Sequence, residues 1–259
     1  MMQLRIALVL CLSALMAGCG SSSNSSSSVP GPVSGNWQMS LLPTGAGSAK
    51  QQSGFLVQTG GTITGSLMFL DSPCSGIGDV SGTVNGTSVS LAVNPTGVQI
   101  ALTGTLGSNQ QTMGGDFTIL QAGCSGTSSA PLAGTWTADL VKALNGNITG
   151  TFVSKENVAY PITGQITQGP NTGVSTAALS GSLNVTGYCF ASANIVGTVS
   201  GTALVISLVN ADGSQAGQIN AISSLDGTQV SGSYSILAQG STGMAPCKGG
   251  DGGTVTFNL

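Results

Sequence analysis

Residues 82–93 read Gly-Thr-Val-Asn-Gly-Thr-Ser-Val-Ser-Leu-Ala-Val, and this stretch decides the fold class. Val89, Leu91 and Val93 alternate with small or polar residues, which is the period of a β-strand with one buried and one exposed face. Asn85-Gly86 just before them is typical of a tight hairpin turn. Similar runs recur about every 8–12 residues between glycine-containing breaks, so the sequence predicts an all-β antiparallel fold.

The same stretch has a second copy further along the chain, because Gly82-Thr-Val-Asn-Gly-Thr87 matches Gly197-Thr-Val-Ser-Gly-Thr202. We therefore predict a tandem duplication of an antiparallel β-barrel or β-sandwich unit, with repeats over residues 33–130 and 131–259. Three further pairs of segments match, and they occur in the same order in both repeats. They are Gly35-Asn-Trp37 with Gly134-Thr-Trp136, Gly65-Ser-Leu67 with Gly181-Ser-Leu183, and Gly115-Asp-Phe-Thr-Ile-Leu120 with Gly232-Ser-Tyr-Ser-Ile-Leu237.

A targeting signal precedes the two repeats. Residues 6–16 are apolar and too short to span a bilayer, which is typical of a secretory signal. They end in Met16-Ala17-Gly18-Cys19, which resembles the lipobox of bacterial lipoproteins. The resemblance implies a signal peptide over residues 1–18, a diacylglycerol thioether on Cys19, and often a further acyl chain such as palmitate on its freed amino group. Residues 19–32, rich in Ser and Pro, are then a flexible tether.

The same resemblance predicts a location. By the sorting rule of these lipoproteins, Gly20 rather than Asp after the lipidated cysteine favours the outer membrane. We therefore expect an exported protein of the cell envelope that meets the membrane through its lipid anchor. The sequence leaves open whether it faces the periplasm or the cell surface.

The composition limits the kinds of partner and catalytic site that the chain can provide. The 259 residues include 5 Lys+Arg, 8 Asp+Glu and no His. Scattered cations argue against nucleic acid as a partner. Without histidine, the common Ser-His-Asp and Cys-His arrangements and His-ligated metals are absent. We predict no catalytic residues, no metal, no cofactor and no enzymatic activity, and we interpret Gly249-Gly-Asp-Gly-Gly253 as a flexible loop.

Four cysteines remain besides Cys11 and the lipidated Cys19. An exported chain meets an oxidising compartment, so an even count indicates disulfides. Four cysteines allow three connectivities, and the duplication selects one equivalent bridge in each repeat. We predict the pairs Cys74–Cys124 and Cys189–Cys247.

Gly35-x-Trp37 and Gly134-x-Trp136 resemble the Gly-x-Trp that opens the first strand of lipocalin- and avidin-like barrels. Those families bind small, often apolar ligands inside eight-stranded barrels, so the resemblance implies Trp37 and Trp136 as ligand or core aromatics. The families' pocket residues do not transfer, because the only arginine is Arg5 and there is no further tryptophan.

These observations predict a lipid-anchored envelope lipoprotein with a non-catalytic binding or structural role. Its partner would be a small apolar ligand or an envelope protein. One alternative is a lipocalin-like carrier of a small apolar ligand. The other is a surface adhesion or envelope-structure protein.

Replacing Cys19 by serine tests the anchor. The Cys19→Ser variant has no thiol to carry the diacylglycerol, so we expect it to leave the membrane fraction and to lose the mass of the lipid. Cell fractionation with mass spectrometry measures both. A variant that stays in the membrane fraction with unchanged mass would place the anchor elsewhere.

Overall fold

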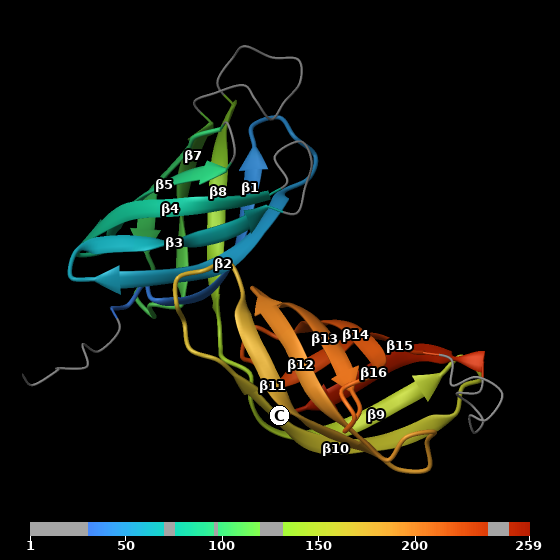
Figure 1. Cartoon of the computed structure of the whole chain (residues 1–259). Helices are drawn as coiled ribbons and strands as arrows, with labels where there is room; N and C mark the ends of the chain where they lie inside the picture. The colour runs from blue at the N-terminus through green and yellow to red at the C-terminus, as the bar shows by residue number, and fades with distance from the viewer. Residues whose placement is uncertain (1–30, 70–75, 96–97, 120–131, 238–248) are drawn as a thin grey trace, which may run out of the picture.

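The computed structural model describes residues 31–69, 76–95, 98–119, 132–237 and 249–259, and these form two closed antiparallel β-barrels (Figure 1). Strands β1–β8 pair in chain order and β8 returns to β1, while β9–β16 close the second barrel through the pairing of β16 with β9. The predicted all-β tandem duplication is confirmed, and each unit is a barrel rather than a sandwich.

The first barrel consists of β1 Gly35–Pro43, β2 Lys50–Thr59, β3 Thr62–Phe69, β4 Gly76–Asn85, β5 Ser88–Pro95, β6 Ile100–Leu106, β7 Thr112–Ile119 and β8 Leu132–Val141. The second consists of β9 Asn145–Ser154, β10 Ala159–Gln168, β11 Ala177–Val185, β12 Ser192–Ser200, β13 Ala203–Val209, β14 Gln215–Ser223, β15 Gln229–Ile236 and β16 Asp251–Asn258. No helix in these described ranges is long and apolar enough to cross a membrane.

The boundary between the barrels differs from the expected one between residues 130 and 131. Strand β8, which carries Gly134-Thr-Trp136, hydrogen-bonds to β1 and so closes the first barrel, with Trp136 opposite Leu41. By strand order, the equivalents in the second barrel are Gly253-Thr-Val255 of β16 for β8, and Gly146-Asn-Ile148 of β9 for β1. The two tryptophan signals therefore mark the first and last strands of one barrel, and the second barrel begins at Asn145.

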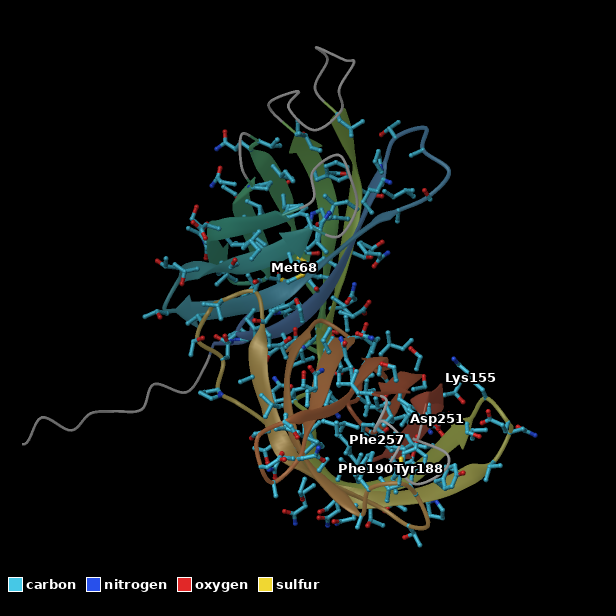
Figure 2. The ribbon with its side chains drawn as sticks, turned by 45° about the vertical axis from the view of Figure 1, so that its right-hand side comes forward. Met68, Lys155, Tyr188, Phe190, Asp251 and Phe257 are labelled. Atoms are coloured by element: carbon cyan, nitrogen blue, oxygen red, sulfur yellow. The ribbon has the colours of Figure 1, made fainter. Side chains whose placement is uncertain are left out.

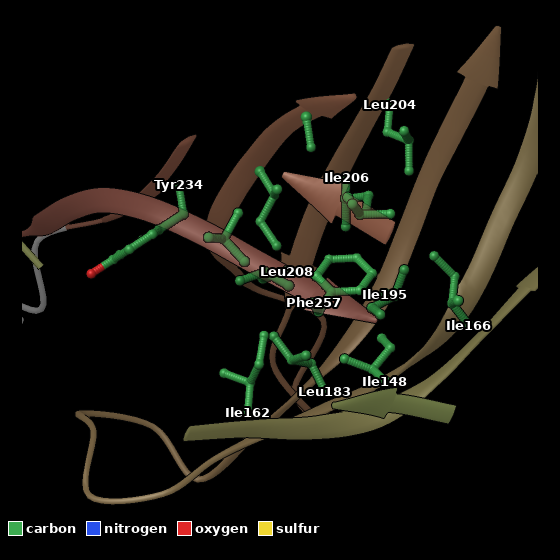
Figure 3. Packing of buried hydrophobic residues seen from close by; sticks show 14 of the residues in the cluster. Ile148, Ile162, Ile166, Leu183, Ile195, Leu204, Ile206, Leu208, Tyr234 and Phe257 are labelled. Atoms are coloured by element: carbon green, nitrogen blue, oxygen red, sulfur yellow. The ribbon is translucent and has the colours of Figure 1, made fainter. Parts of the chain in front are cut away.

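Inward-facing apolar side chains fill each barrel. The first barrel holds one buried cluster that includes Trp37, Leu67 and Trp136, and the second holds another that includes Ile148, Leu183 and Ile206. Figure 3 shows the aliphatic side chains of the second cluster converging from strands all round the barrel. Eight strands leave an interior just wide enough for side chains to fill, so this packing follows from the strand number.

Glycines at mid-strand allow the barrels to close. A Cβ on Gly164 of β10 would overlap the backbone carbonyl oxygen of Ser182 on β11, and one on Gly181 would overlap that of Gln165. Large inward side chains stand opposite, since Gly164 pairs with Leu183 and Ile148. Such small-to-large alternation fits a tightly coiled sheet. The same overlap with a neighbouring strand's carbonyl oxygen occurs at Gly54, Gly65, Gly82, Gly104, Gly115, Gly134, Gly150, Gly197, Gly217, Gly232 and Gly253.

The second barrel docks on the side of the first through several hydrogen bonds and an apolar contact. Asn36 Nδ2 donates to the Gly201 carbonyl oxygen at 2.8 Å, and the Gly201 amide donates to Asn36 Oδ1 at 2.7 Å. The Ser53 and Ser200 hydroxyls lie 2.8 Å apart. Phe55 of β2 packs into the core of the second barrel, whereas the adjacent Leu56 belongs to the core of the first. Strand β2 is therefore buried on both faces where the barrels meet.

Replacing Gly164 by alanine tests the close approach. Overpacking a well-packed interior costs about 1–3 kcal/mol, so we expect Gly164→Ala to lower the free energy of unfolding by at least about that amount. Gly249→Ala is the matched control, because nothing lies within 4 Å of a Cβ built there. Chemical denaturation followed by circular dichroism measures both variants, and equal stabilities would show that glycine is not required at the crossing.

Candidate functional site at the mouth of the second barrel

Carboxylates are few in this chain, which has 8 Asp+Glu, and two of them serve local turns. Asp212 and Asp226 lie in exposed turns, where they accept hydrogen bonds from nearby residues. The hydroxyls of Ser224 and Thr228 and the Thr228 amide hold the pKa of Asp226 at about 2. These two carboxylates serve their own turns, as the Asp-Gly pairs in the sequence indicate.

Five aromatic side chains gather at the end of the second barrel where β9 meets β10 and where β11 meets β12. They are Phe152 of β9, Tyr160 of β10, Tyr188 and Phe190 of the β11–β12 connection, and Tyr234 of β15. We call this set the aromatic mouth. The Phe152 and Tyr234 rings stack with centroids 4.4 Å apart, and Tyr188 contacts Tyr160 at 4.7 Å and Phe190 at 5.5 Å.

One carboxylate joins two hydroxyls of the aromatic mouth. Asp251, the first residue of β16, accepts hydrogen bonds on Oδ2 from Tyr188 Oη at 2.5 Å and from Tyr234 Oη at 2.9 Å. In Figure 3 the Tyr234 ring points away from the aliphatic core, with its hydroxyl outermost. Burial is the main cause that raises the pKa of Tyr188 and of Tyr234 far above the usual tyrosine value. Both phenols therefore remain protonated donors at neutral pH.

Backbone pairing positions the carboxylate. The Lys155 amide donates to the Gly252 carbonyl oxygen at 3.0 Å, which ties the β9–β10 turn to the start of β16. Figure 2 shows Lys155, Asp251, Tyr188 and Phe190 at the same end of the barrel. The expected flexible loop over Gly249–Gly253 is thus wrong in part, because residues 251–253 are the start of β16 and pair with β15.

This arrangement can orient a small molecule. Tyr188, Phe190 and Tyr234 belong to the buried core of the second barrel, so a molecule at this end would contact the outer rim of the rings, where Tyr160 and Asp251 are partly exposed. The Asp251 carboxylate, held by two neutral hydroxyls, offers an acceptor at a fixed position. Barrel mouths are a common location for ligand sites. Within the described ranges, no group of three or more His, Cys, Asp or Glu residues is placed to hold a metal ion.

The residues singled out from the sequence lie elsewhere. Trp37 and Trp136 are buried in the first barrel, and their indole Nε1 atoms donate to the carbonyl oxygens of Val33 at 2.9 Å and Thr103 at 3.1 Å. They are core residues there and take no part in the aromatic mouth. Of the cysteines, Cys189 is disulfide-bonded and packs against the second core. Cys19, Cys74, Cys124 and Cys247 lie outside the described residues, so the lipidation and both pairings stay predictions.

Sequence reasoning missed Tyr188, Tyr234 and Asp251. One signal was available, because all three tyrosines of the chain fall in its second half. Nothing local connects them, however. They come from a loop and two strands, and only closure of the barrel brings them together.

Comparison with known proteins adds little. No family model matches the chain, and no curated protein matches it. Among solved structures it is similar to kievitone hydratase from Nectria haematococca, at 11% identity and a TM-score of 0.23, over 89% of this chain and 90% of that one. The prediction that the chain is not an enzyme is contradicted by this comparison, since the matched chain is named a hydratase. At this TM-score the likeness carries no argument about a reaction, a substrate or a catalytic residue.

The tyrosines of the mouth predict an alkaline transition. Their folded-state pKa values lie above the unfolded value of about 10, so their contribution to stability is fully present below pH 10 and is lost as the pH rises towards the folded values. We expect Tyr188 and Tyr234 to ionise only as the second barrel unfolds. Tyrosinate absorbance measures the ionisation and circular dichroism measures the unfolding in the same alkaline titration. The urea-unfolded chain provides the reference titration of unfolded tyrosines. Ionisation of Tyr188 and Tyr234 near pH 10 in a fully folded protein would contradict it.

Proposed function

We propose that this chain is a lipid-anchored binding protein of the cell envelope, tethered through Cys19, whose second barrel binds a small apolar ligand at the aromatic mouth. The gathering of five rings around one hydrogen-bonded carboxylate is the observation that carries the binding proposal. The lipobox and the Ser-rich tether support the anchor.

The mouth favours a particular ligand chemistry. The outer rims of Tyr160, Tyr188 and Phe190, which pack against one another, offer edge contacts to a flat apolar molecule. Because both tyrosine hydroxyls already donate to Asp251, the group this pair presents to a ligand is an acceptor. The best fit is a neutral ring compound that carries one hydroxyl or N–H donor.

The barrel around the mouth supplies rigidity. Phe152 packs beneath Tyr234 and is fully buried, so the wall of the site rests on the core. A site whose side chains are already packed loses little freedom on binding, which favours affinity. A lipid-tethered binder of this kind would keep its ligand at the membrane surface.

Calorimetry with 1-naphthol tests the proposal. Naphthalene, which has the same rings but no hydroxyl donor, is the comparison ligand. We expect saturable binding of 1-naphthol that is tighter than that of naphthalene. Phe190→Leu removes one ring at similar volume and is expected to raise the Kd of 1-naphthol by about 2- to 10-fold, the range for an aromatic contact.

Phe69→Leu is the matched control, since Phe69 is a buried phenylalanine in β3 of the first barrel. It should leave the Kd unchanged. Failure of 1-naphthol to saturate the protein, or an equal effect of the two substitutions, would overturn binding at the mouth and leave the anchor to its own test.

A further inference from the structure

A second surface of the chain has the features of a binding site. A groove of about 600 Å³ runs over the outside of β9, β16, β15 and β14. One row of residues crosses it through adjacent strands: Thr151 pairs with Thr256, Thr256 with Ser231, and Ser231 with Ile222. Thr149, Asn258 and Gln229 form the next row.

The lining combines uncharged polar side chains with the apolar residues Ile222, Val230 and Phe257. Its outward-facing polar side chains are those of Thr149, Thr151, Ser224, Gln229, Ser231, Thr256 and Asn258, and none is ionisable near neutral pH. Hydroxyl and amide groups both donate and accept hydrogen bonds. Along a strand, groups on one face repeat about every 6.8 Å, and neighbouring strands lie about 4.8 Å apart. The groove therefore presents a lattice of two-way hydrogen-bonding groups.

A buried hydroxyl without a hydrogen-bond partner lies behind the groove, on the inner face of β14. Ser223 is 6% exposed, and in the described part of the chain its Oγ is a buried side-chain atom without a hydrogen-bond partner. Buried polar groups normally have partners, and leaving one unpaired costs stability. Because Ile222 is exposed on the outer face of β14, the alternation of the strand turns the adjacent Ser223 side chain towards the barrel interior, and its hydroxyl is not offered to a ligand in the groove.

We propose that this groove binds a neutral, hydroxyl-rich ligand of the oligosaccharide class. Sugar hydroxyls donate and accept in the same way as the lining, and the exposed Ile222 side chain offers contact to the apolar face of a sugar ring. An anionic ligand finds no cation among the lining residues. An extended peptide finds no free strand edge, because β9 and β16 are paired on both sides.

Calorimetry with neutral hexasaccharides of glucose and of N-acetylglucosamine tests the proposal, and an anionic hexasaccharide of galacturonic acid is the charged counterpart. We expect saturable binding of at least one neutral sugar, weaker binding of the anionic one, and little change between low and physiological salt, since few charges are present to be screened. Thr256→Val keeps the side-chain shape and removes one central hydroxyl, so the Kd should rise by about 2- to 10-fold.

Thr198→Val is the matched control, because Thr198 is exposed on the outer face of β12 and does not line the groove. It should leave the Kd unchanged. Absence of binding by every neutral sugar, or equal effects of Thr256→Val and Thr198→Val, would overturn the proposal.

Discussion

Close approach of neighbouring backbones at mid-strand is the constraint on which the two barrels depend. Gly164 and Gly181 show it clearly, because each faces a carbonyl oxygen that leaves no room for a Cβ. A sheet of only eight strands must coil tightly to close, and a glycine allows the bend while a large residue on the next strand fills the interior. The 41 glycines of the chain, which look like low complexity in the sequence, include this structural set.

The packed interiors determine where binding sites can lie on the barrels. Since apolar side chains fill the described core of each barrel, the available sites lie at the ends and on the outer faces. Docking of the second barrel through Asn36, Gly201 and Phe55 covers one of its ends. The opposite end carries the aromatic mouth. Its rings differ from the aliphatic side chains beneath them, and this contrast is what distinguishes the mouth from ordinary core.

Scarcity of charge shapes both proposed sites. In the mouth, the single carboxylate of Asp251 is held by neutral phenols rather than by a cation. On the groove, the proposed recognition depends on hydroxyl and amide groups together with the exposed Ile222 side chain. Neither arrangement needs histidine or arginine, so the composition that argued against the common hydrolytic sites is fully compatible with selective binding. The composition alone, however, did not justify the prediction that the chain has no enzymatic activity.

The sequence by itself determined the local features of this protein. Alternation over Val89–Val93 and the turn after Asn85 predicted strands and a hairpin correctly, because both depend on residues next to one another. The repeated segments predicted a duplication for the same reason. Closure was decided only by the tertiary structure: β1 and β8 are almost a hundred residues apart, and their pairing placed Trp37 and Trp136 in one barrel rather than two. Tyr188, Tyr234 and Asp251 likewise meet only after closure, since no local pattern encodes a contact among a loop and two strands.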